Sequence, residues 1–182
     1  AASDKYLHAR AVDKPADHLT VENFDIEFKD MAADSALSFT YSDYATAKTI
    51  KILNVSTAGS RGAIWAIGSS NGMFQDITSP APVELNSCRF MTVENNTVAG
   101  VFLEEASTDN IISKNDLTGA TGADLRTNDM ACQRNLFDSN NIHGGAYDTG
   151  AIAIFEGVDN TVSHNTVHDG RAWIWLGTTK GS

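Results

Sequence analysis

A short phrase, an Asn followed two positions later by an apolar residue, recurs along the second half of the chain. The copies are Asn96-Thr97-Val98, Asn115-Asp116-Leu117, Asn140-Asn141-Ile142 and Asn165-Thr166-Val167. In each copy an apolar residue stands three positions before the Asn, and weaker copies upstream place Phe24, Leu53 and Gln75 at the Asn position. A unit of about 19 to 29 residues cannot bury an apolar face alone, so the repeat predicts a solenoid.

A second phrase precedes each unit and consists of a small residue followed by alternating apolar and polar residues. Examples are GAIWAIG from Gly62, GVFLEE from Gly100, GADLRT from Gly122 and GAIAIFE from Gly150. Alternation with period two predicts a short strand with one buried face. The two phrases together predict an all-β fold, a parallel β-helix of about seven coils that stack at ~4.8 Å. Asn residues in successive coils should then form ladders of side-chain amides.

The combined pattern, G-[VIA]-x-[IL]-x-x followed by N-x-[VI]-x-x-N-x-[VIL], resembles the repeat of the pectate-lyase-like superfamily. That group includes polysaccharide lyases, uronate epimerases, glycoside hydrolases and phage tailspikes. The resemblance covers about residues 18–176, and it implies a single-stranded right-handed parallel β-helix that acts on or binds an extracellular or cell-surface polysaccharide. We expect residues 1–182 to form one domain, with a lead segment at 1–17 and a tail at 177–182.

Charge and cysteine placement narrow the classes of partner and the covalent structure. A formal net charge of −10 argues against nucleic acid and against an anionic membrane as the main partner. Cys88 and Cys132 fall in one column of the repeat, two coils apart, with Ser107 between them. Two coils span ~9.6 Å, which exceeds the Cα separation of about 7 Å that a disulfide allows. We therefore expect two free, buried thiols.

Alternation also assigns the two faces of the strands in the second phrase. The inward residues should be Ile64, Val83, Leu85, Val101, Leu103, Ala123, Leu125, Ile152 and Ile154. The outward residues should be Trp65, Glu84, Asn86, Phe102, Glu104, Asp124, Arg126, Ala153 and Phe155. Aromatic rings pack against the C–H face of a sugar, so we predict a glycan groove lined by Trp65, Glu84, Phe102, Trp173 and Trp175. A solvated sheet face with alternating charges is the alternative interpretation.

Two histidines occupy equivalent positions in successive units. His143 and His168 each follow a repeat Asn by three residues and should stack on adjacent coils, with His164 in a nearby column. The adjoining loops add Tyr147, Asp148 and Asp169. Two turn histidines bonded to neighbouring backbone are the simpler alternative to a functional cluster.

A His/Tyr/Asp cluster is suited to abstracting the C5 proton of a uronate. By the resemblance to the lyase and epimerase members, His143 or His168 would be the base and Tyr147 the acid. Arg126 would neutralise the substrate carboxylate. No H-x-H, H-E-x-x-H or calcium-loop spacing is present, so no metal ligand is assigned. Ca²⁺ would enter as a bridge between an acidic groove and an acidic polymer.

Three functions remain open at this stage. The first is a polysaccharide lyase or C5-epimerase that uses the histidine region. The second is a glycoside hydrolase or tailspike-like depolymerase that uses Glu84, Glu104 and Asp124 as acid and base. The third is a non-catalytic β-helix that binds glycan or serves as a structural element. Because the sequence stops just after a strand, we also expect an exposed sheet edge, which a homotrimer or the remainder of a longer chain would cover.

Overall fold

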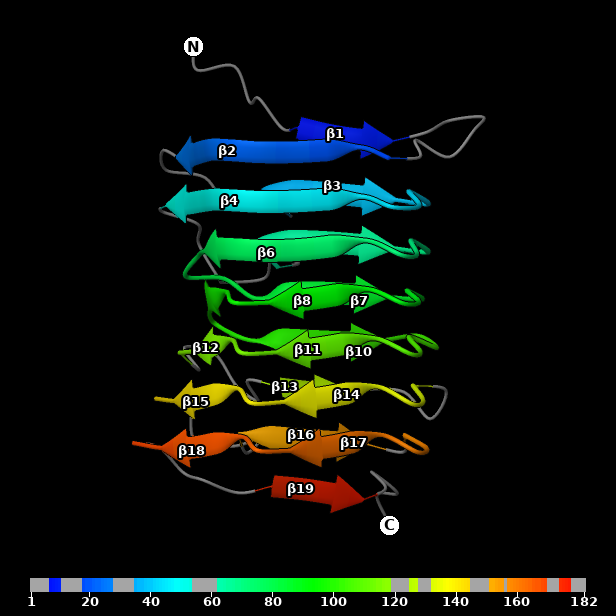
Figure 1. Cartoon of the computed structure of the whole chain (residues 1–182), viewed down its shortest axis with the longest axis vertical. Coiled ribbons are helices and arrows are strands. Elements are labelled where there is room, and N and C mark those ends of the chain that lie inside the picture. The colour runs from blue at the N-terminus through cyan, green and yellow to red at the C-terminus, as the bar shows by residue number, and fades with distance from the viewer. Residues whose placement is uncertain are drawn as a thin grey trace.

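Parallel strands wound into stacked coils make up the regular structure of this chain (Figure 1). The computed structural model describes residues 7–10, 18–27, 35–53, 62–118, 125–127, 132–144, 151–155, 157–169 and 174–177. Within these ranges no helix is long and apolar enough to cross a membrane. The predicted all-β parallel β-helix is confirmed.

One strand of each coil belongs to an eight-stranded sheet that follows the order of the coils. Its strands are β1 (Leu7–Arg10), β3 (Leu37–Thr40), β5 (Ile64–Ile67), β7 (Val83–Asn86), β10 (Val101–Glu104), β13 (Leu125–Thr127), β16 (Ile152–Phe155) and β19 (Ile174–Gly177). β1 lies in the lead segment, where the sequence indicated no element, and it pairs in parallel with β3. The stack of coils therefore begins before residue 18.

The remaining strands form an eleven-stranded sheet, which changes character along the axis. Its first three strands are β2 (Thr20–Glu27), β4 (Thr46–Leu53) and β6 (Met73–Thr78). Later coils divide this stretch into two short strands separated by a turn. These pairs are β8 (Thr92–Glu94) with β9 (Thr97–Val98), β11 (Ile111–Ser113) with β12 (Asp116–Leu117), β14 (Leu136–Asp138) with β15 (Asn141–His143), and β17 (Thr161–Ser163) with β18 (Thr166–His168).

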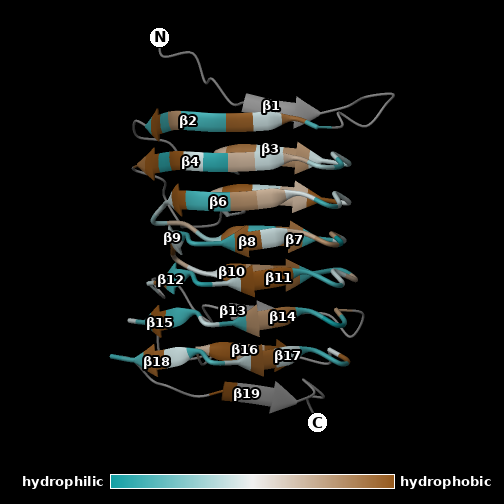
Figure 2. Ribbon diagram, in the orientation of Figure 1, coloured by the Kyte–Doolittle hydropathy of each residue, from teal (hydrophilic) through white to brown (hydrophobic). Residues whose placement is uncertain are grey.

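Apolar side chains from both sheets form one core. Figure 2 shows that strands of both sheets carry hydrophobic residues. Seven of the residues predicted to point inward lie in this core: Ile64, Val83, Leu85, Val101, Leu103, Ile152 and Ile154. The other two, Ala123 and the side chain of Leu125, lie outside the described part of the chain. Parallel pairing stacks equivalent positions of successive coils on one another, as Val83, Val101 and Leu125 show, so a periodic sequence produces a continuous core.

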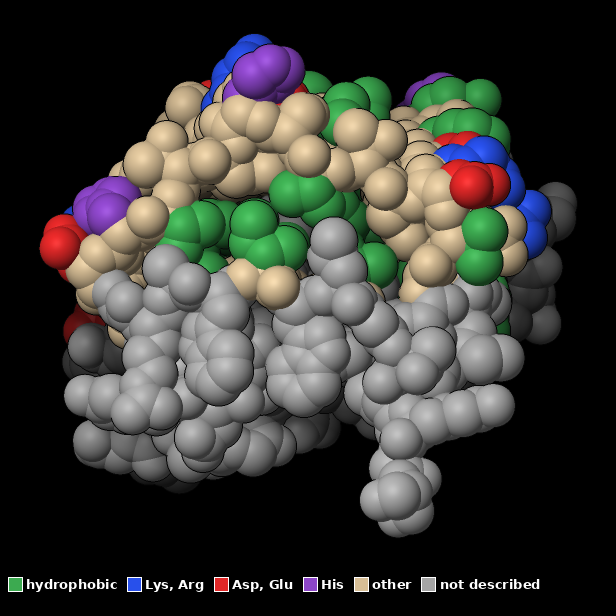
Figure 3. All heavy atoms as spheres, turned by 90° about the horizontal axis from the view of Figure 1, so that it is seen from below, with side chains coloured by type: hydrophobic (Ala, Val, Ile, Leu, Met, Phe, Trp, Pro, Cys, Tyr) green, Lys and Arg blue, Asp and Glu red, His purple; other side chains and the backbone are tan. Residues whose placement is uncertain are grey.

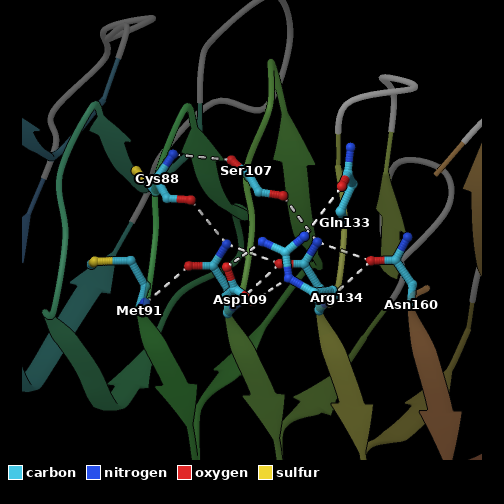
Figure 4. A network of polar contacts seen from close by, with 9 residues as sticks. Cys88, Met91, Ser107, Asp109, Gln133, Arg134 and Asn160 are labelled. Atoms are coloured by element: carbon cyan, nitrogen blue, oxygen red, sulfur yellow. Dashed lines mark hydrogen bonds and ion pairs between the residues drawn. The ribbon is translucent and has the colours of Figure 1, made fainter. Parts of the chain in front are cut away.

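Two ladders of Asn side chains, buried except in the last coil, fix the turns of the eleven-stranded sheet. One ladder joins Asn96, Asn115, Asn140 and Asn165, and the other joins Asn110, Asn135 and Asn160. In the first, Asn115 Nδ2 donates to Asn140 Oδ1 at 3.0 Å and to the Val93 carbonyl at 2.9 Å. The second ladder begins beside Met91, whose backbone N–H donates to Asn110 Oδ1 (Figure 4). The predicted Asn ladders are thus confirmed.

The repeat position was wrong in two of the three weaker copies. Phe24 does pair in the ladder column, but its partners in the next two coils are Ile50 and Ile77 rather than Leu53 and Gln75. The N–H of Ile77 donates to Asn96 Oδ1 at 2.9 Å, which places Ile77 one step above the first ladder Asn. These coils carry no Asn at the turn, so an alignment based on the repeated Asn could not identify the equivalent position.

Both cysteines are free and buried, as predicted. The N–H of Cys88 donates to Ser107 Oγ at 3.2 Å, so Ser107 occupies the same column one coil further on. Parallel bridges join the residues that follow Cys88, Ser107 and Cys132 in successive coils. One intervening coil therefore separates the two thiols.

Candidate functional site

The outer face of the eight-stranded sheet carries most of the predicted glycan-binding residues in one column. By register this column contains His8, Ser38, Trp65, Glu84, Phe102, Arg126, Ala153 and Trp175. Trp65 and Glu84 are half-buried. The predicted position of Trp65, Glu84, Phe102 and Arg126 on one side of the sheet agrees with the register.

Phe102 does not offer the open ring that we predicted for a binding surface. It lies outside the core, yet it is only 7% exposed, and Ala153, two strands further along the same column, is fully buried. Alternation along a strand gives the side of the sheet on which a residue lies. It does not tell whether that side is covered, and this is why the expected exposure of Phe102 and Ala153 was wrong.

Several other predicted residues cannot be placed in a site. Asp124, Tyr147 and Trp173 lie outside the described residues, and for Arg126 and Trp175 only the backbone is described. The sequence pattern aligned the phrases that begin at Gly100 and Gly122 and so placed Phe102 beside Asp124. This alignment was two residues out of register, since Phe102 pairs with Arg126. Arg126 belongs to the eight-stranded sheet, whereas His143 and His168 belong to the other. The backbone therefore does not bring Arg126 into the same strand stack as the histidines.

Glu84 and Glu104 lie on adjacent strands but not opposite one another. Glu104 pairs with Asn86, two positions beyond Glu84. A diagonal across neighbouring parallel strands spans about 8 Å between Cα atoms. Glu84 Oε1 also accepts a hydrogen bond from the Gly62 N–H at 3.1 Å. The Cα atoms of the two residues are thus separated by more than one strand spacing.

His143 and His168 form a stacked pair of titratable side chains at the surface. They end β15 and β18, pair in register, and their rings stack with centroids 5.3 Å apart and planes 14° apart. The predicted stacking on adjacent coils is confirmed. The repeated phrase produces it because the Asn ladder fixes the phase of both strands, and each His then follows its ladder Asn by the same number of residues.

A carboxylate of the preceding coil orients His143. Its Nε2 lies 3.0 Å from Asp116 Oδ1, which also accepts a hydrogen bond from Asn141 Nδ2 at 2.8 Å. An ionised carboxylate only accepts, so the Nε2 of His143 carries a proton. Within the described residues, Nδ1 of His143 makes no hydrogen bond. This geometry leaves Nδ1 available as a base.

His168 also contacts a side chain of the preceding coil, but its hydrogen-bond partners differ from those of His143. Its Nε2 lies 3.0 Å from Asn141 Oδ1, and its Nδ1 lies 2.8 Å from Asp169 Oδ2. Since Asn141 directs its Nδ2 to Asp116, the atom that faces His168 is an oxygen that only accepts. A ring with protons on both nitrogens satisfies both contacts. The two rings therefore differ in their contacts, since both nitrogens of His168 face acceptor oxygens and one nitrogen of His143 does.

The turn after each histidine explains the second partner of His168. Gly144 follows His143 with φ +75°, and an added Cβ there would lie 2.9 Å from the Thr118 carbonyl oxygen. Asp169 occupies the equivalent place after His168, with φ 51°. Asp tolerates this left-handed conformation better than most residues, and its side chain is then close to the ring of His168.

The pair is open to solvent. The side chains of His143 and His168 are 31% and 44% exposed, and that of Asp169 is 86% exposed. Seen from the C-terminal end, histidine side chains lie at the rim of the described surface, and one group borders acidic side chains (Figure 3). A substrate can therefore reach both imidazole rings.

A second histidine contact lies in the neighbouring column, as predicted for His164. Asp138 Oδ1 accepts from Ser163 Oγ at 2.6 Å and lies 2.7 Å from His164 Nδ1, while Oδ2 accepts from Ser139 Oγ at 2.8 Å. The hydrogen bonds from Ser163, His164 and Ser139 lower the pKa of Asp138 from 3.8 to about 2. Ser163 donates to the carboxylate and not to His164, so the group does not activate a serine nucleophile.

Sequence reasoning missed Asp116 and Asn141 as partners of the histidines. A signal was present, because both residues directly follow a ladder Asn and each stands in the coil before a His. Among the described residues, no group of three or more His, Cys, Asp or Glu side chains is arranged to hold a metal ion.

Comparison with known proteins adds the hand of the coil. A family model described as the right-handed β-helix region matches residues 35–181. No curated protein and no solved structure matches the chain significantly. The match thus covers most of the chain and describes its architecture.

Proposed function

Since this chain belongs to the right-handed β-helix family, whose members in the pectate-lyase-like group act on polysaccharides, we propose that it is a polysaccharide lyase that acts at the His143–His168 pair. The observation that carries the proposal is the stacking of two solvent-accessible rings with different hydrogen-bond partners. One ring is set up to accept a proton and the other to give one. General acid–base catalysis requires that combination.

The proposed reaction is β-elimination at a uronate residue. Nδ1 of His143 takes the proton from C5, and the electrons of that C–H bond form the C4–C5 double bond. The bond from C4 to the glycosidic oxygen breaks, and the leaving oxygen takes a proton from His168. Asp169 is exposed and can turn away, which frees the Nδ1–H of His168 for this transfer. Exchange of protons with solvent restores both rings.

The geometry favours elimination over C5 epimerisation. Epimerisation removes a proton from one face of the sugar and returns one to the opposite face. Two parallel rings 5.3 Å apart leave no room for a sugar between them, so both lie on one side of a bound substrate. Removal of the C5 proton and protonation of the glycosidic oxygen from the same side is a syn elimination. C5 epimerisation would need a second group on the other face, the role that the sequence suggested for Tyr147.

The proposed substrate is a uronate-containing glycan outside the cell or at its surface. A positive charge near the uronate carboxylate stabilises the developing carbanion. The imidazolium of His168 would provide such a charge locally on a chain whose formal net charge is −10. Added Ca²⁺ would serve as a bridge between an acidic protein and an acidic polymer, and is therefore one variable of the test.

A second candidate, an inverting glycoside hydrolase, is favoured by one observation. Glu84 and Glu104 are diagonal neighbours on β7 and β10. Inverting enzymes separate their two carboxyl groups by about 6.5–9.5 Å to admit a water molecule, and a Cα diagonal of about 8 Å is compatible with such a separation. This reaction yields new reducing ends without a double bond.

The decisive experiment incubates the protein with alginate, polygalacturonate, xylan and a neutral glucan, with Ca²⁺ or with a chelator. Ultraviolet absorbance of the unsaturated product and reducing ends are measured in parallel. The lyase predicts both signals on a uronate polymer, and the loss of both in His143→Ala and in His168→Ala. His164→Ala is the matched control, because it removes an exposed histidine that also contacts a carboxylate, and it should retain activity.

Two results would overturn the proposal. One is reducing ends without ultraviolet absorbance, abolished by Glu84→Gln or Glu104→Gln, which would establish the hydrolase. The other is full activity in both variants of the histidine pair. Circular dichroism and the urea midpoint of each variant verify that a loss of activity is not a loss of fold.

A further inference from the structure

A second exposed surface lies away from the histidine pair, at the turn that leads from the eight-stranded to the eleven-stranded sheet. We call it the edge column; its residues are His18, Tyr44, Asn71, Phe90, Asp109, Arg134 and Asp159. Backbone hydrogen bonds connect these turns from coil to coil, for example from Tyr44 N to the Ser70 carbonyl and from Asn71 N to the Arg89 carbonyl. The turns form the right-hand edge of the molecule in Figure 1.

In the lower half of the edge column, Arg134 and Asp109 form an ion pair. Arg134 Nε and Nη2 each lie 2.7 Å from an oxygen of Asp109, and Arg134 Nη1 donates to Gln133 Oε1 (Figure 4). The hydrogen bonds from Arg134 keep the pKa of Asp109 below its usual value. The members of this half therefore bind one another, and none of them carries an aromatic ring.

The upper half of the column carries aromatic rings instead. The rings of His18 and Tyr44 stack with centroids 4.7 Å apart and planes 8° apart. Phe90 follows two coils later, so its turn lies ~9.6 Å from that of Tyr44 along the axis. Tyr44 is 50% exposed and Phe90 57% exposed. Between them, Asn71 Nδ2 donates a hydrogen bond to Ser70 Oγ at 3.0 Å, which leaves the side-chain oxygen Oδ1 of Asn71 to accept from another donor.

Tyr41 extends this surface sideways. It lies in the same turn as Tyr44 and is 61% exposed. Its ring covers Gly68 of the next coil, where an added Cβ would lie 2.5 Å from two ring carbons. The upper edge thus presents the rings of Tyr41, Tyr44 and Phe90 with an amide between two of them.

These aromatic residues occupy a backbone conformation that does not favour them. Every member of the edge column has a positive φ, and the values for Tyr44 and Phe90 are 57° and 54°. The left-handed region suits Gly, Asn and Asp, and a bulky side chain there is strained. Asn71, Asp109 and Asp159 follow that preference, whereas Tyr44 and Phe90 do not. Every coil of the column repeats this left-handed turn, as Arg134 also shows, so the fold imposes the φ value and aromatic residues occupy it at a cost in strain.

We propose that the upper edge, Tyr41, Tyr44, Asn71 and Phe90, binds a polysaccharide chain that runs along the axis of the coil. Aromatic rings offer apolar surface to the C–H groups of sugars, and the hydroxyl of Tyr gives a polar contact at the rim. His18 covers one face of the Tyr44 ring, so the other face and the ring edge are the surface that Tyr44 offers. The spacing of Tyr44 and Phe90 is comparable to the length of a disaccharide, and the oxygen of Asn71 accepts from a sugar hydroxyl between them. The ligand class follows the proposed function, but the binding site is separate from the histidine pair.

Affinity electrophoresis in gels that contain alginate, polygalacturonate, xylan or a neutral glucan tests this site. The full chain should be retarded by at least one polymer, and each of Tyr44→Ala and Phe90→Ala should weaken binding by roughly two- to tenfold. Phe24→Ala is the matched control, because Phe24 is 55% exposed and lies outside the edge column. Elimination on a short oligosaccharide is measured for the same variants and should not change.

The outcomes separate this site from the catalytic proposal. Retardation that depends on Tyr44 and Phe90 upholds the edge site even if no unsaturated product appears. Migration that no polymer retards, or equal retardation of Phe24→Ala and Phe90→Ala, overturns it. Light scattering completes the test, since a dimer that Phe90→Ala dissociates would make the edge a contact between copies of the chain and would also overturn the proposal.

Discussion

The ring of His143 lies parallel to that of His168, and each ring reaches back to a side chain of the preceding coil. For His143 the partner is Asp116 at 3.0 Å, and for His168 it is Asn141, also at 3.0 Å. The same local phrase, repeated after one turn of the solenoid, thus places two identical residues in different hydrogen-bonding environments. In a solenoid, a change of one partner residue between successive coils can therefore suit one histidine to act as a base and the next to act as an acid.

Asp116→Asn is predicted to lower kcat of the proposed lyase by about tenfold or more, with little change in KM. The carboxylate holds the proton on Nε2 of His143, and a neutral amide would no longer enforce that tautomer. The measurement is steady-state production of the unsaturated sugar by the purified variant. Asp138→Asn is the control, because Asp138 bonds a histidine outside the pair. Equal kcat in the two variants would contradict the role given to Asp116.

Asn115→Ala is predicted to be strongly destabilising. Asn115 Nδ2 donates to Asn140 and to the Val93 carbonyl, and its Oδ1 accepts from the backbone and side chain of Asn96. Each buried group left without a partner costs about 1–3 kcal/mol, so the free energy of unfolding should fall by about 3 kcal/mol or more. Urea denaturation measures the loss. A smaller effect is expected for Asn165→Ala in the same ladder, since Asn165 is half-buried.

The ladder also explains why the register of the later coils could be predicted from sequence. Asn96, Asn115 and Asn140 are each bonded to the Asn of the next coil, so the residue that specifies the turn is itself visible in the sequence. Cys88, Ser107 and the stacking of His143 on His168 followed from that register. In the first coils Ile50 and Ile77 take the ladder position, and the sequence no longer marks the turn.

Exposure was harder to predict than register. Periodicity assigned Phe102 to the outer face correctly, but alternation along a strand does not tell whether that face is covered. The aromatic upper edge escaped notice for a related reason. Tyr44 and Phe90 stand at turns, where alternation stops, and their common column is set by the coil lengths between them.

Cys88 is predicted to be unreactive in the native protein and to make the stability depend on alkaline pH. Burial raises the pKa of its thiol from 9.0 to about 11. The unfolded chain therefore loses this proton at lower pH than the folded chain, so the contribution of Cys88 to stability is constant below pH 9 and falls between about pH 9 and 11, by up to about 2–3 kcal/mol.

Comparison of Cys88→Ala with the wild type isolates this effect. Urea midpoints are measured from pH 7 to pH 11, and the wild type should lose more stability than the variant only above pH 9. A thiol reagent at pH 8 should modify native protein slowly and unfolded protein at both cysteines. Parallel curves for the two proteins through pH 11 would contradict the assignment.

Asp138 is predicted to make the free energy of unfolding depend on pH at the acid end of the range. Hydrogen bonds from Ser163, His164 and Ser139 lower its pKa from 3.8 to about 2. A lowered folded-state pKa stabilises the fold above the unfolded value and loses that contribution as the pH falls towards 2. Asp138→Asn should therefore flatten the decline in stability below about pH 4. A carbon NMR titration of the carboxyl group gives the pKa directly, and Ser163→Ala should raise it.

Phe90→Asn is predicted to stabilise the fold while it weakens polysaccharide binding at the upper edge. Asn adopts φ near 54° with less strain than Phe, and relief of the left-handed conformation is worth about 1 kcal/mol. The exposed ring loses little packing, so the melting temperature should rise. Retardation by the polymer that binds the wild type should fall at the same time. A residue kept only for packing would show a lower melting temperature in this variant, and one without function would show no change in retardation.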